Sequence, residues 1–420
     1  MTIPSPLPRC SSGIPGLDEV LNGGLTCHRL YLVDGNPGAG KTTLALQFLM
    51  EGVRHGETCL YVTLSETEIE LRGSAASHGW SLDGIDIVEQ LVDQSELHGD
   101  ALTMLPSSEI ELTETTRKLL AAVTRLGPSR LVLDSLSEIR LLAQDSLRYR
   151  RQILALKQLF AKSACTVMML DDRTGDNPDL QLHSIAHGVI SLESQSPSYG
   201  HLRRQLQVRK FRGSPFVSGM HDFTIASGGL KVFPRLVASH HLCKFSREVI
   251  KSGNDALDQL LGGGVDRGTA TLLSGPPGSG KSTVALQYAV AAARRGDHAA
   301  IFMFDETRAA LLARCAGIGL DFEEGSGEGQ VSLRQIDPAE VSPGEFASIV
   351  RHAVEDDDAR VVVVDSLNGY LNSMTQDNFL TAQLHELLSY LNNRGVATFL
   401  VIAQNGLVGS GMTTPVDASY

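Results

Sequence analysis

Two segments of the chain, one in each half, carry the pattern G-x-x-x-x-G-K-[ST], which is typical of phosphate-binding loops. The first runs from Gly35 to Thr42 and the second from Gly275 to Ser282. Glycine is needed because backbone N–H groups must approach phosphate oxygens closely, in conformations that a Cβ atom would forbid. Each pattern places a lysine where it can reach the β- and γ-phosphates of a nucleotide. Including the next residue, the expected nucleotide contacts are Gly35, Asn36, Pro37, Gly38, Ala39, Gly40, Lys41, Thr42 and Thr43 in the first half and Gly275, Pro276, Pro277, Gly278, Ser279, Gly280, Lys281, Ser282 and Thr283 in the second.

Oxygen donors suited to Mg²⁺ accompany each loop. The hydroxyl groups of Thr42 and Ser282 follow the lysines, where they can ligate the metal. Asp134 and Asp365 end apolar, β-branched runs, and a carboxylate at the end of such a strand can hold the magnesium shell through water. Such an aspartate alone usually caps a helix, but the upstream phosphate loop in each half favours the metal role. The predicted cofactors are therefore ATP and Mg²⁺.

A third carboxylate lies at a fixed distance from each lysine. Glu66 is 66 − 41 = 25 positions after Lys41, and Glu306 is 306 − 281 = 25 positions after Lys281. Both follow the next strand along the chain, where a carboxylate can orient water near the γ-phosphate. The alternative interpretation is an acid placed favourably at a helix N-terminus.

The two motifs belong to a repeat that covers most of the chain. Lys281 follows Lys41 by 281 − 41 = 240 positions, and the same offset relates Gly13 to Gly253 and Gly79 to Gly319. A chain of 420 residues is long enough for two domains, each with its own core. We expect a first domain over 1–238 and a second over 239–420.

Apolar strand-like runs alternate with helical patterns in both halves. In the first half, 29–33, 58–64 and 131–134 are expected strands, and 42–51 and 147–161 are expected helices. Such alternation is typical of βαβ units with a mostly parallel sheet flanked by helices, the α/β class. The first half then continues through closing strands that we expect to be largely antiparallel (187–192, 205–211 and 223–225), whereas few residues follow Ile402 in the second. We therefore expect the second domain to be incomplete at its C-terminal end.

Composition narrows the possible partners and location. The net charge of −12 argues against a broad nucleic-acid surface, because neutralising phosphates requires clustered Lys and Arg. No apolar run approaches the 18 residues that a membrane helix needs, and the N-terminus lacks the layout of a signal peptide. We expect a cytoplasmic protein that does not insert into membranes.

The combined motifs resemble KaiC and the KaiC-like ATPases of the RecA superfamily. The resemblance rests on the entry Ser12-Gly13-Ile14-Pro15-Gly16-Leu17-Asp18, both phosphate loops, the acidic strand ends and the tandem arrangement. It implies two RecA-like domains that bind and hydrolyse ATP, assemble into a ring, hexameric in this family, and signal to a protein partner. It also places the catalytic base region at Asp305-Glu306 and at Glu66, where Ser65 departs from the family's paired acids.

The family has a K-x-R-G segment whose cations reach the nucleotide of the neighbouring subunit. Lys210-Phe211-Arg212-Gly213 matches it, so the resemblance makes Lys210 and Arg212 candidate catalytic residues. The alternative is a solvated basic strand edge.

Three other functions stay open. An autophosphorylating Ser/Thr kinase is one, although the family's adjacent Ser and Thr acceptors would fall at about Ser419-Tyr420, where tyrosine departs from the pattern. A DNA-dependent recombinase-like ATPase is disfavoured by the acidic charge. A non-catalytic, ATP-dependent scaffold is favoured by Ser65.

Overall fold

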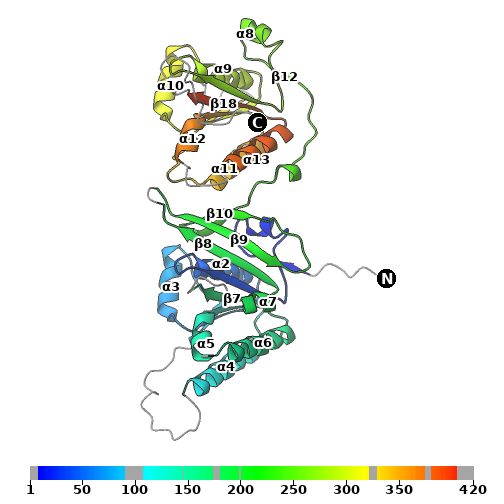
Figure 1. Ribbon diagram of the computed structural model, residues 1–420, viewed down its shortest axis with the longest axis vertical. Coiled ribbons are helices and arrows are strands. Elements are labelled where there is room, and N and C mark those ends of the chain that lie inside the picture. The colour runs from blue at the N-terminus through cyan, green and yellow to red at the C-terminus, as the bar shows by residue number, and fades with distance from the viewer. Residues whose placement is uncertain are drawn as a thin grey trace, which may run out of the picture. The chain divides into compact units, whose positions relative to one another are not determined.

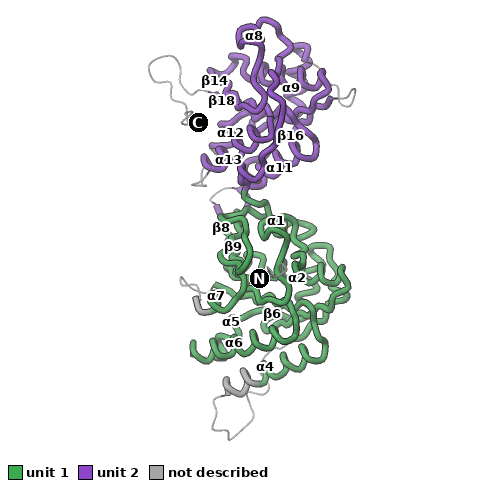
Figure 2. The backbone as a smooth tube through the Cα atoms, turned by 90° about the vertical axis from the view of Figure 1, so that its right-hand side faces the viewer, with its two compact units in different colours: residues 1–196, 202–235 green, residues 197–201, 236–420 purple. Residues whose placement is uncertain are grey.

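The computed structural model describes residues 8–89, 107–143, 145–173, 180–197, 200–320, 329–373 and 380–403. The chain divides into two compact units, one formed by residues 1–196 and 202–235 and the other by residues 197–201 and 236–420 (Figure 2). Each unit contains one of the two phosphate-loop sequences, and each is built on its own central sheet.

The first unit contains a nine-stranded sheet with the order β11-β10-β9-β8-β3-β7-β6-β4-β5 (Figure 1). From β8 to β5 neighbouring strands are parallel, and from β8 to β11 they are antiparallel. The mostly parallel sheet and the antiparallel closing strands were both predicted, and both are confirmed. The strands are β3 (Leu30–Gly35), β4 (Cys59–Thr63), β5 (Ile85–Glu89), β6 (Arg130–Asp134), β7 (Thr166–Asp172), β8 (Gly188–Gln195), β9 (Arg203–Phe211), β10 (Met220–Ala226) and β11 (Gly229–Phe233).

Helices cover both faces of this sheet. Successive strand residues point to opposite faces, so Tyr31 and Val33 enter one core cluster with α2 while Leu30 and Leu32 enter another with α4, α5 and α6. Burial on both faces explains the continuous apolar runs of the strands. The helices are α1 (Leu17–Val20), α2 (Lys41–Arg54), α3 (Glu68–Ser77), α4 (Ser107–Leu126), α5 (Leu136–Ala143), α6 (Ser146–Lys162) and α7 (Leu180–Ile185), and a short ribbon pairs β1 (Arg9–Cys10) with β2 (Leu25–Thr26).

The second unit repeats the parallel part of this arrangement. Its five-stranded sheet has the order β14-β18-β17-β15-β16, which corresponds strand for strand to β3-β7-β6-β4-β5. All its neighbouring strands are parallel. The strands are β14 (Ala270–Gly275), β15 (His298–Met303), β16 (Val331–Gln335), β17 (Ala359–Asp365) and β18 (Ala397–Ala403), and a separate ribbon pairs β12 (Val249–Ile250) with β13 (Val265–Asp266).

Two core clusters again flank the sheet. Ala299, Ile301 and Met303 of β15 pack on the side of α9, and Ala300 and Phe302 pack on the side of α11 and α13. The helices are α8 (Asp255–Leu260), α9 (Lys281–Arg294), α10 (Arg308–Gly317), α11 (Pro343–Glu355), α12 (Leu367–Ser373) and α13 (Leu380–Asn393). Among the described residues, β14 is the edge strand of this sheet, whereas its counterpart β3 is covered by β8.

No helix in the described ranges is both long enough and apolar enough to cross a lipid bilayer.

Candidate functional site

The first phosphate loop connects the carboxyl end of β3 to the start of α2. Gly40 is the N-cap of α2 with φ 102°, a left-handed conformation that favours glycine, and no side chain caps the helix start. A Cβ on Gly35 would lie 2.5 Å from the carbonyl oxygen of Leu192 on β8, so larger residues are excluded there as well. The uncapped N–H groups and the helix dipole together suit a phosphate.

Lys41 is held by three oxygen acceptors beside this loop. Its Nζ donates to the carbonyl oxygens of Gly35 and Asn36, at 3.0 Å each, and lies 2.6 Å from Oδ1 of Asp172. Asp172 ends β7 directly beside Gly35 in the parallel register. The lysine side chain is only 8% exposed, so its charge is well placed to meet an anion at the loop. Asp172 was not among the predicted site residues.

Asp134 ends β6 and lies beside the loop, as the sequence predicted. Its Oδ2 accepts hydrogen bonds from Thr42 Oγ1 at 3.3 Å and from the Tyr61 hydroxyl at 2.5 Å. Burial raises the pKa of Asp134, while the bonds from Tyr61 and Thr42 oppose that shift. A buried carboxylate next to a hydroxyl group is a fitting pair of hard oxygen donors for Mg²⁺. The metal role of both residues stays a prediction.

Glu66 follows β4 on the same edge of the sheet. Thr63 Oγ1 accepts a bond from the Glu66 N–H at 2.9 Å and donates to the Glu66 carbonyl oxygen at 2.7 Å, which fixes the backbone of this turn. Partial burial raises the pKa of the Glu66 carboxyl, and the negative charges of Asp134, Glu70 and Asp172 raise it further. This concentration of carboxylates would attract a divalent cation.

The second loop repeats the geometry with fewer polar contacts. Gly280 is the uncapped N-cap of α9 with φ 88°, and Lys281 Nζ donates to the Pro276 carbonyl oxygen at 2.8 Å. Burial raises the pKa of Asp365 at the end of β17, and a hydrogen bond with Ser282 opposes the shift. The predicted pair of hydroxyl and carboxylate is therefore together in this unit as well. In the register position that corresponds to Asp172, the second unit has Ala403.

The predicted base region of the second unit is bound by neighbouring side chains. Arg314 of α10 donates to both carboxylate oxygens of Glu306, with Nε–Oε1 at 3.2 Å and Nη2–Oε2 at 2.7 Å. Asp305 accepts a hydrogen bond from Ser366 Oγ through its Oδ2. Neither contact could be predicted from the spacing of the motif.

Lys210 and Arg212 do not lie at the phosphate loop of their own unit. Lys210 pairs with Val189 at the beginning of β8, and the N–H of Arg212 donates to the His187 carbonyl oxygen at 3.1 Å. Because β8 is parallel to β3, this is the edge of the sheet away from Gly35. Lys210 Nζ donates to the carbonyl oxygens of His183 and Ser184, and Arg212 Nη2 donates to that of Ser184 at 2.8 Å.

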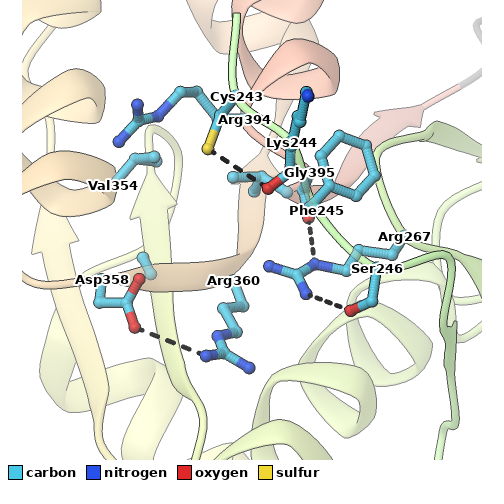
Figure 3. A pocket seen from close by; sticks show the side chains of 12 residues that line it. Cys243, Lys244, Phe245, Ser246, Arg267, Val354, Asp358, Arg360, Arg394 and Gly395 are labelled. Carbon is cyan, nitrogen blue, oxygen red and sulfur yellow. Dashed lines mark hydrogen bonds and ion pairs between the residues drawn. The ribbon is translucent and has the colours of Figure 1, made fainter.

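A cavity of about 320 Å³ lies at the corresponding edge of the second unit, near the amino ends of β17 and β18 (Figure 3). Its lining includes the basic residues Lys244, Arg267, Arg360 and Arg394. Arg360 already pairs with Asp297 at 3.1 Å and with Asp358 at 3.8 Å, and Arg267 Nε donates to the Gly395 carbonyl oxygen at 2.9 Å. This cavity is separate from the phosphate loop and contains none of the predicted site residues. Ser419-Tyr420, the position considered for autophosphorylation, lies outside the described residues.

Comparisons with known proteins agree with this geometry. The circadian clock oscillator protein KaiC of Picosynechococcus sp. is 27% identical over 376 residues, which cover 87% of this chain and 71% of that protein. The circadian clock protein KaiC3 of Synechocystis sp. is 26% identical over 418 residues, covering 98% of this chain and 82% of that protein. The KaiC ATPase family model matches residues 10–237 and 250–413, one segment for each phosphate loop. Because these matches span well over half of its residues, the chain belongs to the KaiC family of ATPases.

Proposed function

We propose that the protein binds Mg·ATP at both phosphate loops, hydrolyses it, and uses the nucleotide state to control assembly into a ring. The observation that carries this proposal is the convergence of Lys41, Thr42, Asp134 and Glu66 at one edge of the first sheet. These side chains come from two separate strand ends and one helix start, and together they supply a cation, metal ligands and a base.

The reaction we propose is in-line attack of water on the γ-phosphorus, with cleavage of the bond to the bridging β–γ oxygen. Lys41 moves from Asp172 to the phosphates and offsets the charge that develops on them. The carboxyl of Glu66, with its raised pKa, orients the water and accepts its proton as the new bond to phosphorus forms. When bound, Mg²⁺ neutralises the phosphate oxygens, and Thr42 and Asp134 are the residues that would hold it.

The ring proposal rests on Lys210 and Arg212. Both cations lie at the edge of the sheet away from their own phosphate loop, so a role in catalysis requires the nucleotide of another subunit. In a closed ring each subunit would supply these cations to the next, which is a heterologous contact. We propose a hexamer that works in the cytoplasm and presents its nucleotide state to a signalling protein. The net charge of −12 argues against nucleic acid as that partner.

Phosphate release and light scattering after size exclusion, measured on the same sample with and without ATP, test this proposal. The wild-type protein should bind two ATP per chain, release phosphate and increase in mass when ATP is added. Lys41→Ala and Lys281→Ala should each remove one bound ATP and leave the fold intact. If both variants kept two ATP per chain, neither phosphate loop would be the nucleotide site.

A further inference from the structure

The two units differ in what surrounds the carboxylate proposed as the base. In the second unit, the guanidinium of Arg314 binds both oxygens of Glu306 through two separate N–H groups. Both side chains are about one-third exposed, so the pair is neither buried nor freely solvated. Two parallel bonds between a guanidinium and a carboxylate give a geometrically specific contact that is stronger than a neutral hydrogen bond.

Among the described residues of the first unit, Glu66 has no equivalent of this pair. The offset of 240 that relates Glu306 to Glu66 places Ser74 at the position of Arg314. In the part of the chain that the structure describes, the Glu66 carboxylate makes neither an ion pair nor a side-chain hydrogen bond, and its close charges are other carboxylates. The two equivalent glutamates therefore have opposite electrostatic surroundings: Glu306 is paired with a cation, and Glu66 lies near other carboxylates.

We propose that Arg314 restrains Glu306 and so makes the second unit the slower of the two ATPase sites. This inference rests on the proposed function, because it assigns a rate difference to the two proposed sites. A carboxylate that orients water needs an available oxygen and an uncompensated charge. Arg314 occupies both oxygens and neutralises the charge. The other acid of the pair, Asp305, is also engaged, since it accepts the bond from Ser366.

The hydrogen bonds that Arg314 makes in the described structure go to Glu306 and not to Lys281 or Ser282, the residues proposed to bind Mg·ATP. Arg314 is therefore expected to leave the binding of Mg·ATP intact while it slows the step that consumes it. The resulting site would hold ATP for long periods.

Steady-state phosphate release in the full chain carrying Lys41→Ala tests this, because only the second unit then turns over. Arg314→Gln should raise kcat about tenfold, the scale of releasing one charged hydrogen-bonded contact, with little change in KM for ATP. Arg314→Lys keeps the charge but loses the two-pronged contact, so it should raise kcat by less. Arg351→Gln is the matched control, since it removes an Arg–Glu pair at 2.8 Å on α11 and should leave kcat unchanged.

Adding Glu306→Gln to Arg314→Gln should abolish the gain, which separates release of the base from a general loosening of the fold. An unchanged or lowered kcat in both Arg314 variants, with thermal melting like that of the parent protein, would overturn the inference. A gain that survives Glu306→Gln would overturn it as well. The amount of ATP bound per chain is measured on the same samples. If the second unit bound no ATP, the proposed function of the second phosphate loop would be refuted, separately from the inference about Arg314.

Discussion

The ion pair between Lys41 and Asp172 leads to a prediction about ATP affinity in the first unit. The same lysine is the proposed ligand of the β- and γ-phosphates, so it must leave Asp172 before it can bind them. Replacing Asp172 with asparagine keeps the shape and an oxygen acceptor but removes the negative charge. We therefore expect Asp172→Asn to bind ATP more tightly than the wild-type protein.

The size of the effect follows from the burial of the two partners. Lys41 is 8% exposed and Asp172 is 31% exposed, with 2.6 Å between Nζ and Oδ1. Fully exposed ion pairs contribute about 0–1 kcal/mol, and hydrogen bonds that involve charged groups contribute about 1.5–3 kcal/mol. A pair with one buried partner lies between these limits, at about 1–2 kcal/mol. This corresponds to a dissociation constant lowered by about 5–30-fold.

Titration calorimetry with ATP, in a background of Lys281→Ala, measures the first unit alone. Asp171→Asn is the matched control, because the neighbouring carboxylate pairs with Arg140 at 2.7 Å and not with Lys41. The control should leave the affinity for ATP unchanged. Weaker binding by Asp172→Asn would refute the argument, and if the loss occurred only with Mg²⁺ present it would make Asp172 a metal ligand instead.

Three further predictions concern the base, the proposed ring and stability. In a Lys281→Ala background, Glu66→Gln should lower kcat about 100-fold or more and change the ATP dissociation constant little, because a residue that orients the attacking water acts mainly in the transition state. Turnover equal to that of the parent protein would show that Glu66 is only an acid at the N-terminus of a helix. Arg212→Ala should lower both ATP turnover and ring formation. Mixing Arg212→Ala subunits with Glu66→Gln subunits, again with the second unit inactivated, should restore some activity. No gain in rings shown to contain both variants would exclude a role for Arg212 at the nucleotide of a neighbouring subunit. Burial, aided by neighbouring cations, lowers the pKa of His187 from 6.5 to about 4, so the unfolded chain takes up the proton first as the pH falls. Stability to urea should therefore fall by about 1–2 kcal/mol between pH 6.5 and pH 4, a figure reduced for the partial exposure of the ring, and His187→Phe should show a smaller fall.

The sequence was sufficient to place those residues of the candidate site that lie within a motif or at a strand end; their functional roles stay predictions. The phosphate loops, Asp134 and Glu66 could be located because each follows an apolar run, and the carboxyl ends of parallel strands meet at one edge of a sheet. The antiparallel closing strands were also expected, from the strand-like segments 187–192, 205–211 and 223–225 that follow the parallel part. These features depend on local patterns, which a single chain displays directly.

Contacts that depend on strand order could not be predicted in this way. Asp172 reaches Lys41 only because β7 is hydrogen-bonded to β3, although, among the described residues, three strands and five helices lie between these two strands along the chain. Tyr61 looks like an ordinary core residue of β4, yet its hydroxyl group lies at Asp134 because β4 pairs with β6. A tyrosine within an otherwise apolar run was the only available signal, since its hydroxyl group needs a partner when buried.

The two units differ in the charged residues around their phosphate loops more than in the loops themselves. In the first, an acid holds the lysine, and the proposed base has no basic partner in the described structure. In the second, the position of that acid is occupied by Ala403, and an arginine holds the proposed base. We expect the acid on the lysine to weaken ATP binding and the arginine on the proposed base to slow hydrolysis. These two differences between the units act in the same direction. They favour rapid ATP exchange and turnover in the first unit and prolonged ATP retention in the second.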